Sequence, residues 1–578
     1  MGPAVDNVEV MRELLIAGMN IARFNFSHGT HEEQRGRIEM LREASRSAGI
    51  PVAVLLDTKG PEIRTGVVRD GGTINLQRGA EIILTTDAID GDENLLSVSY
   101  QNLPYEVQPG GHIFVADGLI NLEITDVRDN RIHCVVQSGG TIGSRKNVNV
   151  PGVKTSLPAV TEKDIADIEF GVSMDIDFIA ASFIRKASDV REVQKLVDKA
   201  GAPVRIIAKI EDEEGLDNIA SITQVSHGVM VARGDLGVQL ETEQIPMAQK
   251  RIIRVCNHLN KPVITATQML DSMIQNPKPT RAELTDVANA IFDGTDAVML
   301  SGETANGKYP IESVQTLHKI AVEVERSAEY IERSKQYFFF HKSSTDIGDA
   351  VTRAAYVVAT DVEADAIVSP SLRGNSPRLL SKYRPTQPVI AVTTSDLVHR
   401  QLLLHWGIYP LLSDYVNDAD SMIQNALRLA LKHGYVKRGD KVVTAAGMPL
   451  NSPIMMNTIK VHFMGNILNR GQRGFGAICS GNVVKAKTVD EAQERSSKAT
   501  MPILLLQNLT ADYAPVLKRI RGLIVENRSD LTLDEIREFN QEMVFVGEVR
   551  DAFRQFEENQ SISLDGDEKI VYEGYLDD

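Results

Sequence analysis

Short apolar runs alternate with amphipathic stretches along most of this chain. Each run is rich in β-branched residues and ends at glycine or polar residues, which is typical of a buried parallel strand. A helical stretch separates each run from the next, apart from one interruption. Seven runs lie at residues 19–26, 52–58, 177–183, 205–210, 228–233, 263–267 and 297–301. The pattern predicts an α/β fold with a parallel sheet and outer helices, one strand short of a (β/α)8 TIM barrel.

Helix-start signals agree with this alternation. Residues 8–18 form an amphipathic stretch that ends at Gly18. Thr30 and Glu33 have the spacing of a capping box, and Thr161, followed by Asp164, is a second predicted N-cap. We therefore expect helices to begin just after residues 30 and 161.

The hydrophobic period changes between residues 61 and 160. Short alternating segments such as TINLQ, EIILTT and NLEITDV follow one another, and paired glycines at 71–72, 110–111 and 139–140 separate them. This pattern predicts a small all-β domain inserted into the barrel. The barrel domain would then consist of residues 1–60 and 161–340.

Two further regions follow the predicted barrel. Residues 345–470 contain strand-like DAIVSP, PVIAVTT, KVVTAAG and KVHFM, which predict another α/β domain. Gly471 to Gly476 is interpreted as a hinge. Residues 476–578 predict a compact tail with strands near 502–506 and 522–526, an acidic helix at 533–541 and a terminal hairpin.

Composition narrows the class of protein. Hydrophobic residues make up 43% of the chain, and 62 basic against 78 acidic residues give a net charge of −16. This charge argues against nucleic-acid binding, so an anionic ligand must meet a local basic cluster. Cys134, Cys256 and Cys479 lack metal-ligand spacing and predict reduced thiols of a cytoplasmic protein. We expect no membrane span, because no apolar run approaches the ~18 residues that a span needs. We also expect no signal peptide, because the N-terminal MGPAVDNVEVMREL lacks a basic start and an apolar core.

Polar side chains follow the ends of the predicted strands. In barrel enzymes the chemistry lies at the carboxyl ends of the strands, so these residues are candidates for the site. They are Arg23, Asn25, Asp57, Thr58, Ser182, Lys209, Glu211, Asp235, Thr267, Gln268, Ser301 and Glu303. One such residue alone could be a solvated side chain or a cap, but the repetition through seven units favours a site.

Glu211 and Asp235 follow two successive strands. Two carboxylates with open coordination positions suit Mg²⁺, which typically takes one or two protein carboxylates together with phosphate oxygens. Lys209 offers a point charge for a phosphate beside them. Either acid alone could equally be a solvated loop residue.

Several motifs together resemble pyruvate kinase. They are ARFNFSHG (22–29), LLDTKGPEIRTG (55–66), AKIEDEEG (208–215), VARGDLG (231–237), TATQMLDSM (265–273), PTRAELTDVANAIFDGTDAVMLSGETA (279–305) and SKYRP (381–385). The resemblance runs from Gly2 to about residue 470. It implies a TIM barrel with an inserted β-barrel lid and an α/β regulatory domain, usually in a homotetramer. It also implies phosphoryl transfer from phosphoenolpyruvate to ADP.

The resemblance also implies residue roles. Catalytic and substrate-binding roles fall on Lys209, Arg23, Thr267, Gly234 and Asp235, the last two through backbone N–H groups. Glu211 and Asp235 would hold Mg²⁺ or Mn²⁺, and Asn25, Ser27, Asp57 and Thr58 would surround K⁺. Asn25, His28, Arg64 and Lys146 would face the nucleotide. Asn25 could instead cap a turn, and His28 could be a packing residue.

The side chain at position 62, here Glu62, indicates whether the enzyme requires a monovalent cation. In the family this position is usually Glu or Lys, and the choice follows K⁺ dependence. A Lys would supply the positive charge that K⁺ otherwise supplies, so Glu62 predicts an enzyme that needs K⁺. Alternatively, Glu62 only pairs with a nearby arginine.

Three features depart from the family pattern. Met1 stands directly before Gly2-Pro3-Ala4, where a first barrel strand is expected, so we expect a misassigned start codon and two strands with unpaired edges. The loop SLRGNSP (371–377) lacks some usual hydroxyl groups, although Ser371, Gly374 and Ser376 could still bind a sugar-phosphate or nucleotide effector. The tail resembles the swivelling phosphohistidine domain of phosphoenolpyruvate-utilising enzymes, but residues 476–578 contain no histidine.

Two other functions remain open at this point. One is a different Mg²⁺-dependent barrel enzyme, an aldolase or lyase acting on a 2-oxo acid. The other is a degenerate, non-catalytic paralogue that senses metabolites. The aldolase or lyase has no need of the residues that would face ADP or of the lid. The missing strand and the altered effector loop favour the paralogue, whereas the complete set of strand-end residues argues against it.

Overall fold

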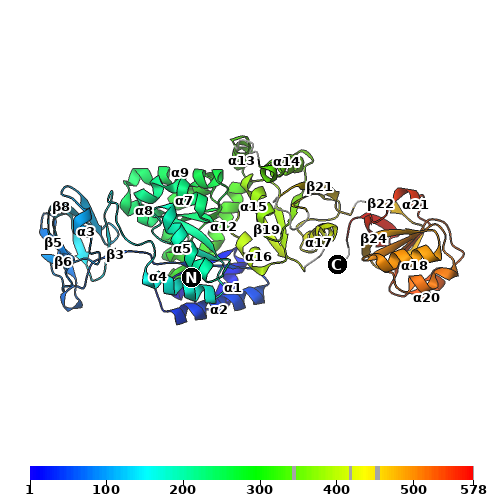
Figure 1. Cartoon of the computed structure of the whole chain (residues 1–578), viewed down its shortest axis with the longest axis horizontal. Coiled ribbons are helices and arrows are strands. Elements are labelled where there is room, and N and C mark those ends of the chain that lie inside the picture. The colour runs from blue at the N-terminus through cyan, green and yellow to red at the C-terminus, as the bar shows by residue number, and fades with distance from the viewer. Residues whose placement is uncertain (341–345, 415–418, 449–455, 466, 577–578) are drawn as a thin grey trace. The chain divides into compact units, whose positions relative to one another are not determined.

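The computed structural model describes residues 1–340, 346–414, 419–448, 456–465 and 467–576. The chain forms two compact units (Figure 1). The first contains Met1–Lys335 together with Leu403–Trp406, and the second contains Gln336–Leu402 together with Gly407–Asp578.

A seven-stranded parallel sheet is the centre of the first unit. Its strands, in spatial order, are β1 (Ile21–Asn25), β2 (Ala53–Asp57), β12 (Phe178–Ala181), β13 (Arg205–Ile210), β14 (Gly228–Ala232), β15 (Val263–Ala266) and β16 (Ala297–Val298). Each lies within a predicted run, so all seven strands are confirmed. Phe24, Leu56 and Ile179 are buried in its core, as expected for strands covered on both faces.

Helices separate the strands as the sequence predicts. They include α1 (Val8–Ile16), α2 (His31–Ala48), α4 (Glu162–Ser173), α5 (Ala187–Lys199), α9 (Ile245–His258) and α10 (Arg281–Phe292). The predicted capping box of Thr30 with Glu33 is present, and the predicted N-cap Thr161 forms a second capping box with Asp164. These caps satisfy backbone N–H groups that the first turn of a helix leaves unpaired.

The sheet is open between its first and last strands. Among the described residues, β1 pairs only with β2 and β16 pairs only with β15. Residues of both strands, with Met1 and Gly2, line a cavity of about 800 Å³ at this place. The Met1 ammonium donates to the Arg23 carbonyl oxygen over 2.6 Å, and burial lowers its pKa to about 5. The expected unpaired edges are therefore observed.

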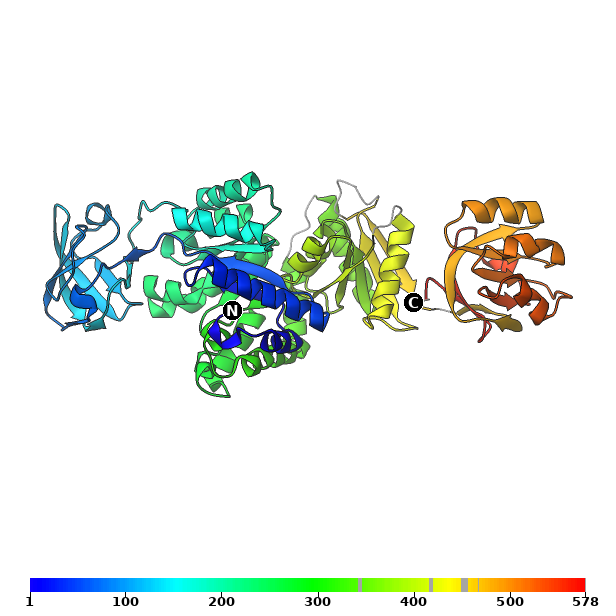
Figure 2. The same cartoon turned by 90° about the horizontal axis from the view of Figure 1, so that it is seen from below.

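The inserted region is all-β, as predicted. Its larger sheet has the order β3 (Ile63–Arg64), β11 (Asn147–Asn149), β7 (His112–Val115), β8 (Ile120–Arg128), β9 (Arg131–Ser138), β5 (Glu81–Thr85) and β6 (Leu95–Ser97). β4 (Ile74–Leu76) and β10 (Gly140–Ile142) form a second pair. Ile82, Leu122 and Val136 belong to a separate core, so this region, drawn in blue to cyan, has its own hydrophobic interior (Figures 1 and 2).

The second unit contains two sheets, the first of which has five strands. Their order is β19 (Ile408–Leu412), β18 (Val389–Thr393), β17 (Ala366–Pro370), β20 (Lys441–Ala446) and β21 (Thr458–Phe463). The sequence predicts all of these except β19. Pro410 lowers the strand signal there, and it is tolerated because β19 is an edge strand.

The tail forms an eight-stranded sheet. The order is β22 (Ile467–Arg470), β29 (Ile570–Glu573), β28 (Ser561–Asp565), β24 (Cys479–Ala486), β25 (Pro502–Leu506), β26 (Gly522–Val525), β27 (Val544–Gly547) and β23 (Arg473–Phe475). Helices α18 (Val489–Lys498) and α20 (Leu533–Phe539) accompany it (Figure 1). The two predicted strands, the acidic helix and the terminal hairpin are confirmed.

The predicted hinge at Gly471 to Gly476 is wrong. β22 ends at Arg470, and β23 pairs with β27 inside the tail sheet. A side chain at Gly474 would stand 2.3 Å from the Gly566 carbonyl oxygen. The glycines here permit close backbone approach, which is the other reason for glycine in a strand.

Cys134, Cys256 and Cys479 are thiols outside any disulfide, in line with the prediction of reduced cysteines, and all three are buried. Within the described ranges, no helix is both long and apolar enough to cross a membrane.

Candidate functional site

Lys209 joins three neighbouring strand ends. Its Nζ lies 2.8 Å from Glu211 Oε1 and 3.1 Å from Asp57 Oδ1, and it donates to Ser182 Oγ over 2.7 Å. Burial disfavours the ammonium, but Asp57 and Glu211 outweigh this and raise the pKa of Lys209. Lys209 is therefore a fixed positive charge at the carboxyl edge of the sheet.

Arg23 brings a second cation to the same point. Its Nε lies 2.5 Å from Asp57 Oδ2, and Asp57 is only 1% exposed. Burial opposes ionisation of Asp57, yet Arg23 and Lys209 outweigh it and hold the pKa of this carboxyl below its usual value. The Asp57 carboxylate thus holds the Arg23 guanidinium and the Lys209 ammonium side by side, where both can contact an anionic ligand.

Glu211 and Asp235 form the predicted acid pair. Burial, with the neighbouring Glu211, raises the pKa of Asp235 to about 7. The Phe183 backbone N–H donates to Glu211 Oε2 over 2.5 Å. Glu211 is buried and Asp235 is half-buried, and together they offer oxygen donors only, which fit a divalent cation of the Mg²⁺ type.

Thr267 has a strained backbone. Its φ of +72° lies in the left-handed region, which is rare for a β-branched residue. Arg233, at the start of α8 (Arg233–Gln239), donates to the Thr267 carbonyl over 2.6 Å and pairs with Asp286 at 2.7 Å. A side chain at Gly234 would lie 2.9 Å from Thr267 Cγ2. Glycine is therefore needed beside Thr267.

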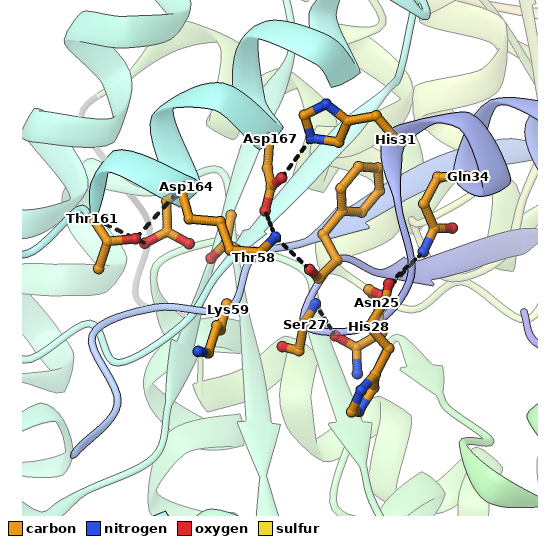
Figure 3. A network of polar contacts seen from close by, with 12 residues as sticks. Asn25, Ser27, His28, His31, Gln34, Thr58, Lys59, Thr161, Asp164 and Asp167 are labelled. Atoms are coloured by element: carbon orange, nitrogen blue, oxygen red, sulfur yellow. Dashed lines mark hydrogen bonds and ion pairs between the residues drawn. The ribbon is translucent and has the colours of Figure 1, made fainter. Parts of the chain in front are cut away.

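The loops after β1 and β2 gather oxygen atoms (Figure 3). Asn25 and Asp57 are register partners, and Asn25 Oδ1 accepts from the Ser27 N–H over 3.0 Å. Thr58 Oγ1 accepts from the Ser182 N–H over 3.1 Å. These neutral and anionic oxygens, brought together from two adjacent loops, fit a hard monovalent cation. His28 is exposed at the end of the first loop.

The nucleotide candidates of the insertion lie on adjoining strands. β3 and β11 pair, and Thr65 and Lys146 exchange two hydrogen bonds, 2.7 and 2.8 Å long. Arg64 pairs with Glu62 at 2.6 Å, so the alternative pairing for Glu62 is observed. A cleft between insertion and sheet is lined by Glu62 on one side and by Phe183 and Asp235 on the other.

The effector candidates lie in one turn of the second unit. Ser371 follows β17, Gly374 has a φ of +71°, and α15 (Asn375–Lys382) begins directly after it. Ser376 is buried in the first turn of α15. The structure therefore brings the three residues together, although the Ser376 side chain faces the interior.

Sequence reasoning missed the supporting contacts. Ser182 was recognised only as a strand-end residue, yet it receives the Lys209 hydrogen bond. The Arg233–Asp286 pair carried no signal, because its partners lie 53 positions apart.

Fold and site together define an enzyme of the βα-barrel class with a cationic and acidic centre for an anionic substrate. The family model described as "Pyruvate kinase, barrel domain" matches residues 1–314, and "Pyruvate kinase, alpha/beta domain" matches residues 349–462. The chain therefore belongs to the pyruvate kinase family.

Known proteins agree with this assignment. Pyruvate kinases of Geobacillus stearothermophilus and Sporosarcina psychrophila are 44% and 42% identical over 579 residues, covering 100% of this chain and 98% of each relative. A crystal structure of a pyruvate kinase from Cryptosporidium parvum is 39% identical, with a TM-score of 0.77 over 80% of this chain and 94% of that chain. The protein is a phosphotransferase that converts phosphoenolpyruvate and ADP to pyruvate and ATP. The aldolase and paralogue alternatives are not supported.

Proposed function

We propose that Lys209 and Arg23 carry the phosphoryl transfer. The main observation in support is that Lys209 and Arg23 both form ion pairs with Asp57, and that Lys209 also donates a hydrogen bond to Ser182. Phosphoryl transfer depends mainly on positioning and on stabilising developing charge. Arg23 would hold the phosphate, and Lys209 would stabilise the transferring group and the enolate oxygen.

Glu211 and Asp235 would hold Mg²⁺ or Mn²⁺. A bound divalent ion supplies positive charge toward the substrate oxygens. This assignment is supported by the buried Glu211, the half-buried Asp235 beside it and the raised pKa of Asp235. The backbone N–H groups of Gly234 and Asp235, with the Thr267 hydroxyl, would hold the substrate carboxylate.

Asn25, His28, Arg64 and Lys146 would face ADP. Arg64 and Lys146 come from the insertion, which would act as a lid and exclude water when it closes. The cleft that Glu62 shares with Asp235 supports this role. The test is a coupled assay of ATP formation with Arg64→Gln, which we expect to raise the KM for ADP and leave that for phosphoenolpyruvate nearly unchanged. Equal effects on both substrates would contradict the assignment.

Activity is expected to depend on K⁺. Asn25, Ser27, Asp57 and Thr58 would hold the ion, whose charge offsets that of the two substrates. We expect low activity in tetramethylammonium buffer and a saturable rise with added KCl. Equal rates with and without K⁺ would refute the site.

Glu62 variants separate two explanations of that dependence. Glu62 already pairs with Arg64 and lies 3.7 Å from Lys59, so its charge is locally balanced. Glu62→Lys should reduce the K⁺ requirement if an ammonium can replace the ion, whereas Glu62→Gln should retain it. If the K⁺ requirement falls in both variants, the loss of the Glu62–Arg64 pair is the cause and not the added ammonium.

Deleting the tail should leave kcat largely unchanged. The tail has its own two cores and lies in the second unit, away in sequence from every proposed catalytic residue. The cut should precede β22, because β22 and β23 belong to the tail sheet. Steady-state rates and size-exclusion chromatography of the truncated protein provide the measurement. A large loss of kcat with an unchanged oligomer would contradict the prediction.

The remaining assignments extend the family resemblance. We infer a cytoplasmic homotetramer, and a sugar-phosphate or nucleotide effector at Ser371, Gly374 and Ser376. The tail would be a swivelling-type domain without a phosphohistidine, serving a structural or interaction role. Isothermal titration with fructose phosphates and nucleoside monophosphates would test the effector site.

A further inference from the structure

The start of α4 holds both loops that carry the proposed K⁺ ligands. Lys163 Nζ donates to the Phe26 carbonyl oxygen over 2.8 Å, and Phe26 stands between Asn25 and Ser27. Asp164 Oδ1 accepts from the Gly60 N–H over 3.0 Å, two residues after Thr58. We call Lys163, Asp164 and Asp167 the α4 clamp.

The buried carboxylate of Asp167 holds the Lys163 side of the clamp. Asp167 is 1% exposed, and its Oδ2 lies 2.6 Å from Lys163 Nζ. Its other oxygen lies 2.7 Å from His31 Nε2, at the start of α2 (Figure 3). The His31 ring stacks on Phe170 at 4.5 Å. Asp167 therefore directs the Lys163 ammonium toward the Phe26 carbonyl oxygen.

Helix capping fixes the Asp164 side. Its Oδ2 accepts from both the backbone N–H and the hydroxyl of Thr161, over 2.9 and 2.6 Å. The other oxygen, Oδ1, accepts from the Gly60 N–H. Figure 3 shows the contact between Thr161 and Asp164. Gly60 has a φ of +73°, and a side chain there would lie 2.8 Å from Ser182 Cβ. The loop after β2 is therefore held from both sides.

We propose that the α4 clamp is a positioning device that sets the affinity of the monovalent-cation site. The proposal rests on the K⁺ site assigned above. A cation site depends on the distance between its oxygen donors, and here the donors come from two loops that one helix end spans. Lys163 and Asp164 bind the backbone beside those donors, and Asp167 holds Lys163. Loss of a clamp residue should therefore change the donor spacing while leaving the donor side chains in place.

Potassium titrations of clamp variants test the proposal, followed both by ATP formation and, without substrates, by the rise of the melting temperature with KCl. In Lys163→Met and Asp164→Ala, the half-saturating KCl concentration should rise by about 3- to 10-fold, in line with the loss of one positioned hydrogen bond. At saturating KCl, kcat should stay within about two-fold of the wild type, because the reacting groups are untouched. Lys163→Arg keeps a charged donor and should restore most of the affinity. Lys195→Met replaces an exposed lysine of α5 and should match the wild type.

The outcomes separate the clamp from the cation site. If the activity of the wild-type enzyme does not respond to K⁺, both the proposed K⁺ site and the proposed role of the clamp are refuted. A responsive wild type with unchanged half-saturation in the variants overturns the clamp alone, even if their melting temperatures fall. A lower half-saturating KCl in Lys163→Met also overturns it, because the lysine would then act by repelling the ion.

Discussion

Lys209→Met is expected to lower kcat by about 10²- to 10³-fold, the typical effect of losing one preorganised charge donor. The side chain meets Asp57, Glu211 and Ser182 within 3.1 Å, so its ammonium is positioned before substrate arrives. Methionine keeps most of the volume and removes the charge. The coupled assay of ATP formation at saturating substrates and metal measures the loss.

The fold of this variant should persist. Asp57 keeps its pair with Arg23, and Glu211 keeps the Phe183 N–H, so neither carboxylate is left without a partner. Circular dichroism and size-exclusion chromatography provide the check, with Lys195→Met as the matched control. A folded variant within a few-fold of wild-type turnover would remove Lys209 from the catalytic role.

Glu211→Gln and Asp235→Asn should each raise the half-saturating Mg²⁺ concentration by about 10- to 100-fold. This range corresponds to the roughly 1.5–3 kcal/mol that a charge-assisted contact contributes. Because both groups would bind one ion, the double variant should lose less than the sum of the single losses. Mg²⁺ titrations of all four proteins complete the cycle, and additive effects would refute a shared site.

Stability without metal gives an independent control for Asp235. Burial and Glu211 raise its pKa to about 7 in the folded protein, above the ordinary value of 3.8 for an aspartate carboxyl. Ionisation therefore destabilises the folded state as the pH rises through this interval. At pH 8 and without Mg²⁺, Asp235→Asn should be at least as stable to denaturant as the wild type. A clear loss of stability would indicate a structural role.

The main sheet could be predicted because each of its strands repeats one signal. A buried apolar run followed by polar residues defines both the strand and the residues at its carboxyl end, so Lys209 and Glu211 were found together with β13. The β19 strand was missed because Pro410 weakens that signal. The hinge was misplaced because glycine marks close backbone approach as well as flexibility, and only tertiary structure distinguishes the two.

Side-chain partners were less predictable than positions. The Glu62–Arg64 pair was foreseen as an alternative, since its partners are two residues apart. Arg233 and Asp286, or Lys163 and the Phe26 carbonyl, are brought together only by the fold. Periodicity carries no information about such contacts. The cluster at Lys209 was nevertheless foreseeable in outline, because neighbouring parallel strands end at one edge.

The left-handed Thr267 limits how heat resistance can evolve in this protein. Glycine would relax the backbone there, since a strained conformation of this kind costs roughly 1–3 kcal/mol. The same change would remove the methyl group that adjoins Gly234 and the hydroxyl proposed to hold the substrate. With the proposed role of the Thr267 hydroxyl, a lineage adapting to higher temperature would lose turnover if it recovered this stability. Thermal adaptation would then draw on positions other than Thr267.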